Sequence, residues 1–331
     1  MPCTDCPRTC ASRGPRSFCG LDRPGRVYWQ GVTLLEEHEL APTYEVWLTG
    51  CSLRCRFCTV SDAIERPRDF PWRSPDAVLD AMVDPTTPPF RTISLVGGDP
   101  SVSRPWVDAF VARARERLPG VPLVLNTNLF VDAARAARDA ETFDFIVGDL
   151  HFWEASCARR LAGASGYPAM ARAAAEATVR AGGQLFLRLL LLPGHADCCG
   201  RPSIAWATEL ARSAPDQVKV HVMTHYAPAG RARGHSQLGR RLSPQEAALA
   251  QTLPADVPRP RVAPLPDLPP RPAGAIDPEV PLEIAADGTI LLPFVTGELL
   301  RVAVDLDPLL AERLVYLNGV ADRLSATDDV R

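Results

Sequence analysis

The feature that most constrains the fold of this chain is a repeated alternation of apolar runs with alanine-rich helical stretches. Six runs are typical of buried strands, and a helical pattern follows each of the first five. An alternation of this kind predicts an α/β fold with a parallel sheet, in the form of a partial (β/α)6 TIM-like barrel. The six predicted strands are residues 44–49, 92–97, 122–127, 143–150, 184–193 and 217–225.

The predicted helices carry recognisable start and stop signals. The clearest patterns cover residues 74–83, 105–118 and 167–182. Ser74 is expected to cap the first of them, with Pro75 at its first helical position, and Gly182 is expected to end the third. Helices between consecutive strands are what a parallel sheet requires.

Regions outside the repeats divide the chain further. We predict a cysteine-rich N-terminal segment at 1–40, the barrel core at 41–253, a proline-rich linker at 254–279 and a small C-terminal α+β unit at 280–331. Asp287 and Gly288 stand between hydrophobic runs and predict a β-hairpin in the last unit. That unit is too small for an independent enzyme, so we expect it to cap the barrel or dock a partner.

Composition excludes several classes of partner. The net charge of -3 gives no reason to expect nucleic acid or an anionic membrane as a partner. The N-terminus has no apolar secretory region, and no apolar run reaches the roughly 18 residues of a membrane span. We therefore expect a cytoplasmic protein with no membrane partner. In that reducing compartment its ten cysteines are better candidates for metal ligands than for disulfides.

Three cysteines are concentrated directly after the first predicted strand. Cys51, Cys55 and Cys58 form C-x3-C-x2-C, and the polar side chains of Arg54 and Arg56 between them argue against an ordinary buried loop. The spacing is too tight for a zinc finger and supplies only three ligands. Three thiolates on a four-iron cluster leave one iron open to a small molecule. In a barrel of this kind the loop lies at the end where the chemistry is performed.

A second motif follows the second predicted strand, where Gly97, Gly98, Asp99 and Pro100 form a GGDP segment. Glycines there let backbone carbonyls approach a ligand ammonium group, and the acidic side chain complements its charge. With Phe57 before the last cysteine, these motifs resemble those of radical S-adenosylmethionine (radical SAM) enzymes, whose segment usually has Glu where this chain has Asp99. The resemblance implies a 4Fe-4S cluster on the three cysteines and S-adenosylmethionine bound at the GGDP segment.

Other segments are similar to one branch of that superfamily, the pyruvate formate-lyase activating enzymes. These are LNTN at 125–128, FLRLLLLPG at 186–194, HYAPAG at 225–230 and the N-terminal CTDCPRTC, and together they extend over roughly residues 3–250. The branch usually ends its fourth strand in Asp-x-Lys. Here the sequence is Asp149, Leu150 and His151, so this chain lacks that lysine.

The resemblance also implies a mechanism. A reduced cluster donates one electron to S-adenosylmethionine, and the resulting 5'-deoxyadenosyl radical abstracts hydrogen from a substrate. An electron donor of the flavodoxin or ferredoxin type is the implied partner. Asn126, Asn128, Asp149 and Arg188 lie at or near strand ends, where they are candidates to bind the cofactor or substrate. Arg188 stands within an apolar strand and therefore needs an anionic partner.

Three functions remain open at this point. The first is activation of a glycyl radical enzyme, which the closest-looking branch implies. The second is direct modification of a peptide or small molecule, favoured by the unmatched C-terminal unit and the extra N-terminal cysteines. The third is a non-enzymatic iron-sulfur redox protein, which leaves the GGDP segment and the open iron unexplained.

The remaining cysteines form two further groups. Cys3, Cys6, Cys10 and Cys19 supply four ligands, and we predict a second metal site there, with zinc and an iron-sulfur cluster as alternatives. Cys157, Cys198 and Cys199 are expected in loops after the fourth and fifth strands. We expect them to be ordinary small loop residues, with extra metal ligands or substrate-contacting thiols as alternatives.

Overall fold

The computed structural model describes most of the chain up to residue 260 and three short strands beyond it. The chain divides into two compact units, Met1–Ala263 and Pro264–Arg331, and each is described by itself. None of the helices in the described part is long and apolar enough to cross a membrane. The described residues are 3, 5–8, 10–11, 14, 17–33, 37, 39–260, 283–284, 290–293 and 299–302.

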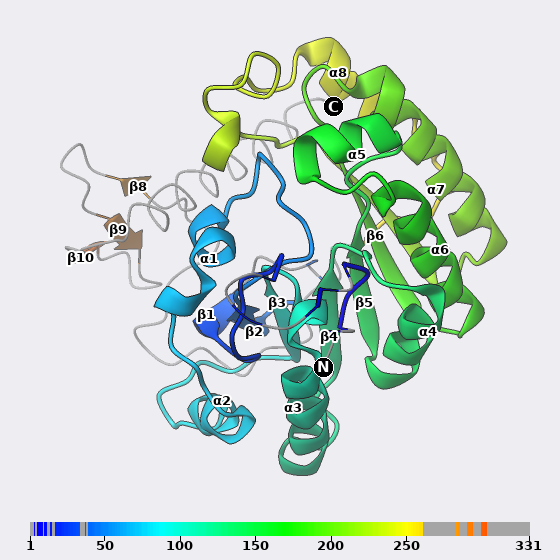
Figure 1. Ribbon diagram of the computed structural model, residues 1–331. Helices are drawn as coiled ribbons and strands as arrows, with labels where there is room; N and C mark the ends of the chain where they lie inside the picture. Colours follow the sequence, from blue (N-terminus) through cyan, green and yellow to red (C-terminus); the bar gives the residue numbers. More distant parts are fainter. Residues whose placement is uncertain are drawn as a thin grey trace. The chain divides into compact units, whose positions relative to one another are not determined.

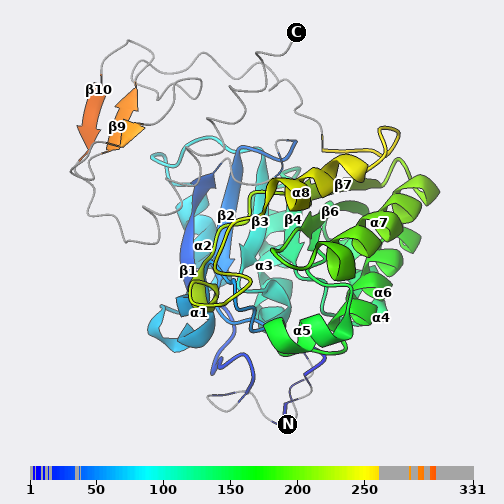
Figure 2. The same cartoon turned by 90° about the horizontal axis from the view of Figure 1, so that it is seen from above.

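The first unit is built on a seven-stranded sheet whose strands lie in chain order (Figures 1 and 2). Strands β2 to β7 are parallel and β1 pairs antiparallel with β2. Each parallel strand neighbours the next one in the chain, and the sheet curves without closing, so the predicted partial (β/α)6 barrel is confirmed. The strands are β1 (Val27–Thr33), β2 (Thr43–Leu48), β3 (Thr92–Gly97), β4 (Leu123–Thr127), β5 (Phe145–Asp149), β6 (Gln184–Leu190) and β7 (Val218–Met223).

Helices connect the parallel strands and cover the outer face of the sheet (Figure 1). The Ser74 hydroxyl accepts a hydrogen bond from the Ala77 amide, as expected of the predicted cap. The α-helices are α1 (Ser61–Glu65), α2 (Pro75–Met82), α3 (Arg104–Arg117), α4 (Ala133–Thr142), α5 (Ala155–Ala162), α6 (Tyr167–Arg180), α7 (Arg201–Ser213) and α8 (Pro244–Ala248). Tighter 3-10 turns are η1 (Pro67–Asp69), η2 (Pro100–Ser103), η4 (Gly230–Ala232) and η5 (Leu249–Thr252), and η3 (Ala196–Gly200) is a π-helical turn.

Strand β1 lies inside the predicted cysteine-rich segment and was not expected. Its residues are mostly half-buried, because it forms an edge of the sheet and pairs with β2 alone. The sequence VYWQGVT therefore lacks the continuous apolar run that marks the central parallel strands. An edge strand of this kind is harder to predict from sequence than the buried central strands, because fewer of its residues are apolar.

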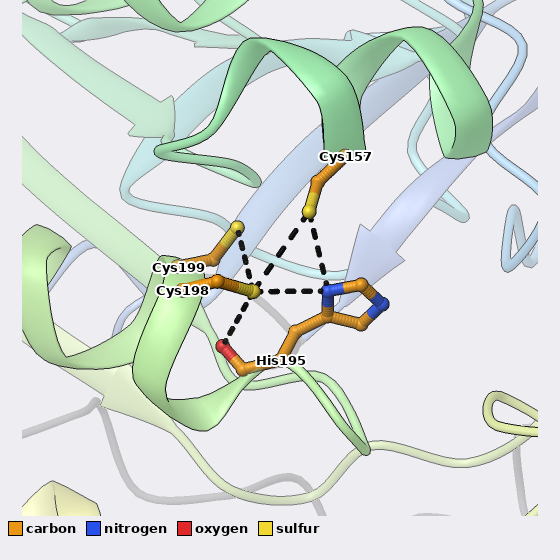
Figure 3. A group of neighbouring side chains, drawn as sticks. All are labelled: Cys157, His195, Cys198 and Cys199. Atoms are coloured by element: carbon orange, nitrogen blue, oxygen red, sulfur yellow. Dashed lines mark hydrogen bonds between the residues drawn. The ribbon is translucent and has the colours of Figure 1, made fainter.

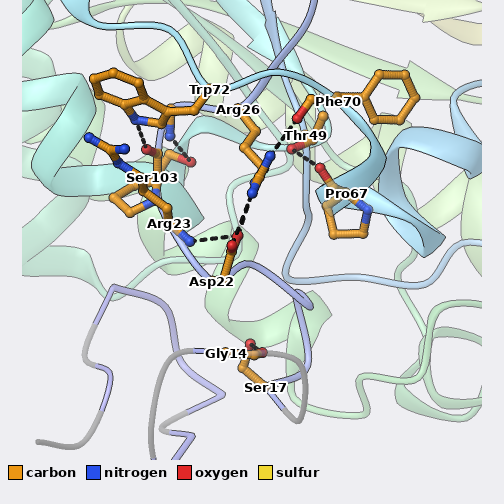
Figure 4. A network of polar contacts seen from close by, with 12 residues as sticks. Gly14, Ser17, Asp22, Arg23, Arg26, Thr49, Pro67, Phe70, Trp72 and Ser103 are labelled. Carbon is orange, nitrogen blue, oxygen red and sulfur yellow. Dashed lines mark hydrogen bonds and ion pairs between the residues drawn. The ribbon is translucent and has the colours of Figure 1, made fainter.

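A polar network fastens the segment before β1 to the barrel (Figure 4). Asp22 and Arg26 form an ion pair at 2.9 Å, and the Arg26 guanidinium also donates to the Phe70 carbonyl at 2.6 Å. The Arg23 guanidinium lies 3.4 Å from the centre of the Trp72 ring. These contacts hold the stretch that follows Cys19 against the short connection between η1 and α2.

The two faces of the sheet carry different cores. Alternate residues of each strand pack against the helices, and the other set faces the barrel interior. At the interior, Val124, Val147 and Phe186 from three neighbouring strands surround the buried Leu40. The chain before β2 therefore contributes to the inside of the barrel, with Glu37 close by.

The predicted linker begins as part of the first unit. Val257 is buried, and the Val220 amide of the edge strand β7 donates to the Pro258 carbonyl at 2.9 Å. Residues 254–260 thus cover an otherwise open sheet edge. The rest of the predicted linker lies outside the described residues.

The second unit contains a small antiparallel sheet in the order β10-β9-β8. Its strands are β8 (Glu283–Ile284), β9 (Ile290–Pro293) and β10 (Leu299–Val302). The predicted turn at Asp287 and Gly288 lies outside the described residues, between two strands that pair antiparallel. The helical part expected of this α+β unit also lies outside the described residues.

Candidate functional site

A cavity of about 220 Å³ lies at the carboxyl ends of the parallel strands. It brings together most of the site residues predicted from sequence, which come from the loop after β2 and from the ends of β3, β4 and β5. The predicted residues that line it are Cys51, Cys55, Phe57, Cys58, Gly97, Gly98, Asn126, Asn128 and Asp149. Asp99, Pro100 and Arg188 are not among its lining residues.

The cysteine loop begins at Gly50, whose φ of 78° lies in the left-handed region that favours glycine. The Cys51 sulfur then accepts hydrogen bonds from the Leu53 amide at 3.3 Å and from the Asn128 side-chain amide at 3.4 Å. Both donors stabilise a thiolate. Burial raises the pKa of Cys51 and raises that of Cys55 well above the ordinary thiol value.

These properties fit an iron-sulfur cluster at the loop. Buried thiols with raised pKa values stay protonated at neutral pH unless a metal centre displaces their protons. The donor set is three thiols, as in a cluster with three protein ligands, and two N–H groups donate to the Cys51 sulfur. Cys51, Cys55 and Cys58 would hold the cluster, and the cavity beside them leaves room for a small molecule.

The GGDP segment is packed directly on the cysteine loop. A Cβ atom at Gly98 would lie 1.9 Å from the Gly50 carbonyl oxygen, and the Asp99 amide donates to that same oxygen at 2.9 Å. Glycine at position 98 is therefore required by the approach of the Gly50 backbone, whereas the sequence suggested an approach to a ligand. Gly98 still lines the cavity, so it shapes the site and holds the loop.

Replacing Gly98 with Ala is expected to lower the iron content of the purified protein and its affinity for S-adenosylmethionine together. The added methyl group must displace the Gly50 backbone and with it the adjacent Cys51. Metal analysis and calorimetry on the same samples test this. Gly166 is a suitable control, because a Cβ there meets no atom within 4 Å and Gly166→Ala should preserve both quantities. Normal iron with weakened binding would show that position 98 affects the ligand alone.

Asp99 is buried, and both oxygens of its carboxylate accept hydrogen bonds from other residues of the protein. One oxygen accepts from the Ser101 amide at 2.8 Å, and the other accepts from the Asn128 amide at 2.8 Å and the Thr127 hydroxyl at 3.1 Å. Burial raises the pKa of this carboxyl group. The carboxylate thus joins the end of β3 to the end of β4 and positions Asn128, which in turn contacts Cys51.

The anionic partner expected for Arg188 is Glu37. The Arg188 Nε donates to the buried Glu37 carboxylate at 2.7 Å, and His221 Nδ1 lies 3.2 Å from the same oxygen. Burial alone would raise the pKa of Glu37, but the hydrogen bond with His221 and the charge of Arg188 outweigh it and lower that pKa to about 2. Arg188 therefore takes part in an ion pair of the barrel interior.

Several lining residues were not predicted from the motifs. Arg231 lies just beyond the HYAPAG segment, donates to the Arg54 carbonyl at 3.0 Å and lies 3.4 Å from Glu65. His151 also lines the cavity, at the position where the similar branch has lysine, and burial lowers its pKa. Its ring contacts Phe57 edge-on at 5.7 Å between ring centres. A search for titratable side chains shortly after each strand would have found both.

The four N-terminal cysteines lie near one another. Burial is the main cause that raises the pKa of Cys6 to about 11, and the thiols of Cys19, Cys3 and Cys10 add to it. The Cys3 amide donates to the Cys10 carbonyl at 2.9 Å, which closes the segment into a loop. The second metal site predicted for these four cysteines stays a prediction.

The expectation for Cys157, Cys198 and Cys199 was wrong in one respect. Cys157 lies on α5, and the other two lie on the π-helical turn η3, not in irregular loops. The structure also brings all three together with His195, which the sequence did not indicate.

Comparison with known proteins finds one family model that matches part of this chain. The sequence model of the radical SAM superfamily matches residues 46–206, which contain the cysteine loop and the GGDP segment. A protein of Methanocaldococcus jannaschii described as uncharacterized protein MJ0674 is 22% identical over 238 residues, which are 70% of this chain and 67% of that protein.

Two solved structures also match part of this chain. The Streptococcus suis SuiB structure bound to precursor peptide SuiA is 13% identical with a TM-score of 0.43, and the match covers 63% of this chain and 44% of SuiB. The anSMEcpe structure with bound AdoMet and Cp18Cys peptide is 14% identical with a TM-score of 0.40, covering 60% of this chain and 54% of anSMEcpe. The chain thus spans less than half the length of SuiB. At residues 46–206 it carries a domain of the radical SAM superfamily, whose enzymes use a 4Fe-4S cluster and S-adenosylmethionine.

Proposed function

We propose that this chain is an enzyme that cleaves S-adenosylmethionine reductively at a 4Fe-4S cluster held by Cys51, Cys55 and Cys58. When bound, these cofactors supply a 5'-deoxyadenosyl radical that abstracts hydrogen from a substrate. The observation that carries the proposal is the cavity that the three thiols share with the GGDP glycines and with polar side chains from β4 and β5.

The chain's own residues bind and orient the cofactor in this proposal. Arg54 and Arg231 line the cavity and carry the positive charge that a methionine carboxylate needs. Asn126 and Asp149 present polar groups at the ends of β4 and β5, suited to the ammonium and ribose hydroxyl groups. Phe57 and several aliphatic side chains line the same cavity and exclude water from it.

We further propose that the hydrogen donor is a glycine of a partner glycyl radical enzyme. The similarity of four chain segments to the pyruvate formate-lyase activating enzymes supports this choice. The test is to incubate the reduced protein with S-adenosylmethionine and a glycyl radical enzyme from the same genome, best one encoded beside it. Electron paramagnetic resonance should then detect a radical on the partner protein, in proportion to the 5'-deoxyadenosine formed.

The same experiment separates activation from direct modification. Formation of 5'-deoxyadenosine with no radical on the partner would contradict the activating role and favour a peptide or small-molecule substrate. Absence of 5'-deoxyadenosine under all reducing conditions, with the cluster intact, would contradict the enzyme assignment. It would leave an iron-sulfur redox protein.

Changing Cys3, Cys6, Cys10 and Cys19 together to Ser is expected to remove one metal centre. If the segment binds zinc, the variant should lose about one zinc per chain and unfold at a lower temperature, because a structural zinc contributes folding free energy. If it binds a second cluster, iron should drop by about four atoms per chain and turnover should fall. Elemental analysis of wild type and variant decides between them. Equal zinc and iron in both proteins would show that these thiols bind no metal.

A further inference from the structure

Four metal-ligating side chains lie together outside the cavity, on the segments that follow β5 and β6 (Figure 3). One ligand atom from each of Cys157, His195, Cys198 and Cys199 lies within 4.8 Å of the other three. All but Cys198 are buried. We propose that these residues, the CCCH group, bind one zinc ion in a closed structural site.

The distances within the CCCH group match ligands of a single tetrahedral ion. The Cys198 sulfur lies 3.8 Å from that of Cys157 and 3.9 Å from that of Cys199. His195 Nδ1 lies 3.4 Å from the Cys157 sulfur and 3.3 Å from the Cys198 sulfur. Zinc bonds of about 2.3 Å to sulfur and about 2.0 Å to nitrogen, at tetrahedral angles, place sulfur pairs about 3.8 Å apart and sulfur-nitrogen pairs about 3.5 Å apart.

The same distances disfavour other uses of these cysteines. Thiolates on different irons of a cluster must spread more widely than ligands of one ion, because each binds its own iron. A disulfide between Cys157 and Cys198 would need its sulfur atoms about 2.0 Å apart, well short of the 3.8 Å found. Three thiolates and one imidazole make a complete set for zinc, with no position open for substrate.

Local backbone structure explains how His195 and the two neighbouring cysteines face one centre. The amides of Cys199 and Gly200 both donate to the His195 carbonyl at 3.0 Å, which makes a π-helical turn ahead of α7. This wider turn places Cys198 and Cys199 beside the His195 ring (Figure 3). Turns of this type are rare in proteins, and those that occur are often found at functional sites. Cys157 on α5 completes the group from the other side.

The chemistry of the CCCH group suits a divalent cation. It supplies three thiols and one imidazole, the donor types that structural zinc sites use. Zinc would displace the thiol protons and be bound by three thiolates and one imidazole nitrogen.

The position of the CCCH group gives the metal a role. Asp149 and His151 before α5, and Leu190 at the end of β6, all line the cofactor cavity. Zinc would link the segment after β5, which contains Cys157, to the segment after β6, which contains His195. These two residues are 38 positions apart in the sequence. It would therefore fix one wall of the cavity without contacting the cofactor.

Metal analysis of the full-length chain tests the proposal. Wild type should contain about one more zinc per chain than Cys198→Ser and than His195→Gln, with equal iron in all three. Ser203→Ala is the matched control, because Ser203 is buried on α7 and lines a small cavity with His195 and Cys199 yet is not a ligand. It should retain the zinc. Equal zinc in wild type and both ligand variants would overturn the proposal.

X-ray absorption at the zinc edge decides the question even if the ligand variants fail to fold. The wild-type spectrum should require nitrogen at about 2.0–2.1 Å beside sulfur at about 2.3 Å. Repeating it on the variant that lacks the four N-terminal cysteines should give three sulfurs and one nitrogen. Wild-type protein without zinc, or zinc bound by sulfur alone, would contradict a CCCH site.

Discussion

Cys55→Ala should abolish the formation of 5'-deoxyadenosine from S-adenosylmethionine. Cys55 lines the cavity with Cys51 and Cys58, and the three thiols are the whole protein ligand set proposed for the cluster. Loss of one thiolate exposes a second iron, so the cluster should be lost or degraded and no electron should reach the cofactor. The assay is chromatographic detection of 5'-deoxyadenosine after anaerobic reduction, with iron measured in the same sample.

Arg56→Ala is the matched control for this prediction. Arg56 lies in the same loop between two of the cysteines, but it does not line the cavity, and its guanidinium contacts the Arg160 carbonyl at 3.4 Å on the exposed side. The control should keep its iron and its turnover within a few-fold of wild type. A Cys55→Ala variant that produces 5'-deoxyadenosine at the normal rate would refute the assignment of the cluster to this loop.

The sequence predicts the barrel well because each strand and helix is marked by a pattern of neighbouring residues. Each central strand is a continuous apolar run, and the strand predicted at 92–97 coincides with β3. Parallel strands bring their carboxyl ends to one edge of the sheet, so motifs after three different strands meet in one cavity once the topology is known. The cysteine loop and the GGDP segment were therefore assigned to a common site without knowledge of any contact.

Contacts between distant segments could not be predicted in the same way. Asp99 has the charge expected of a ligand-binding group, yet its oxygens are bonded to the amides of Ser101 and Asn128. The need for glycine at position 98 comes from the close approach of the Gly50 backbone. The CCCH group depends on a π-helical turn that no local sequence pattern predicts. In each case the identity of the residue is informative, but its partner is set by tertiary packing.

Glu37→Gln should lower the free energy of unfolding by about 3 kcal/mol at neutral pH. The Glu37 carboxylate is buried beside Arg188 and His221, and its pKa falls from the usual 4.5 to about 2 in the folded protein. Glutamine keeps a hydrogen-bonding group of similar size but removes the charge, which leaves Arg188 without its ion pair to Glu37. Urea unfolding of wild type and variant at equal metal content measures the difference.

The pH dependence identifies the carboxylate as the cause. A lowered pKa in the folded state contributes stability that is fully present above pH 4.5 and is lost as the pH falls toward 2. The gap between wild type and Glu37→Gln should therefore narrow as the pH falls from about 4.5 toward 2. Asp62→Asn removes the carboxylate of an exposed ion pair with Arg66 and should produce no comparable gap, because solvent screens that pair. A gap that is unchanged at about pH 3 would mean that packing, and not the charge of Glu37, is the cause of the stabilisation.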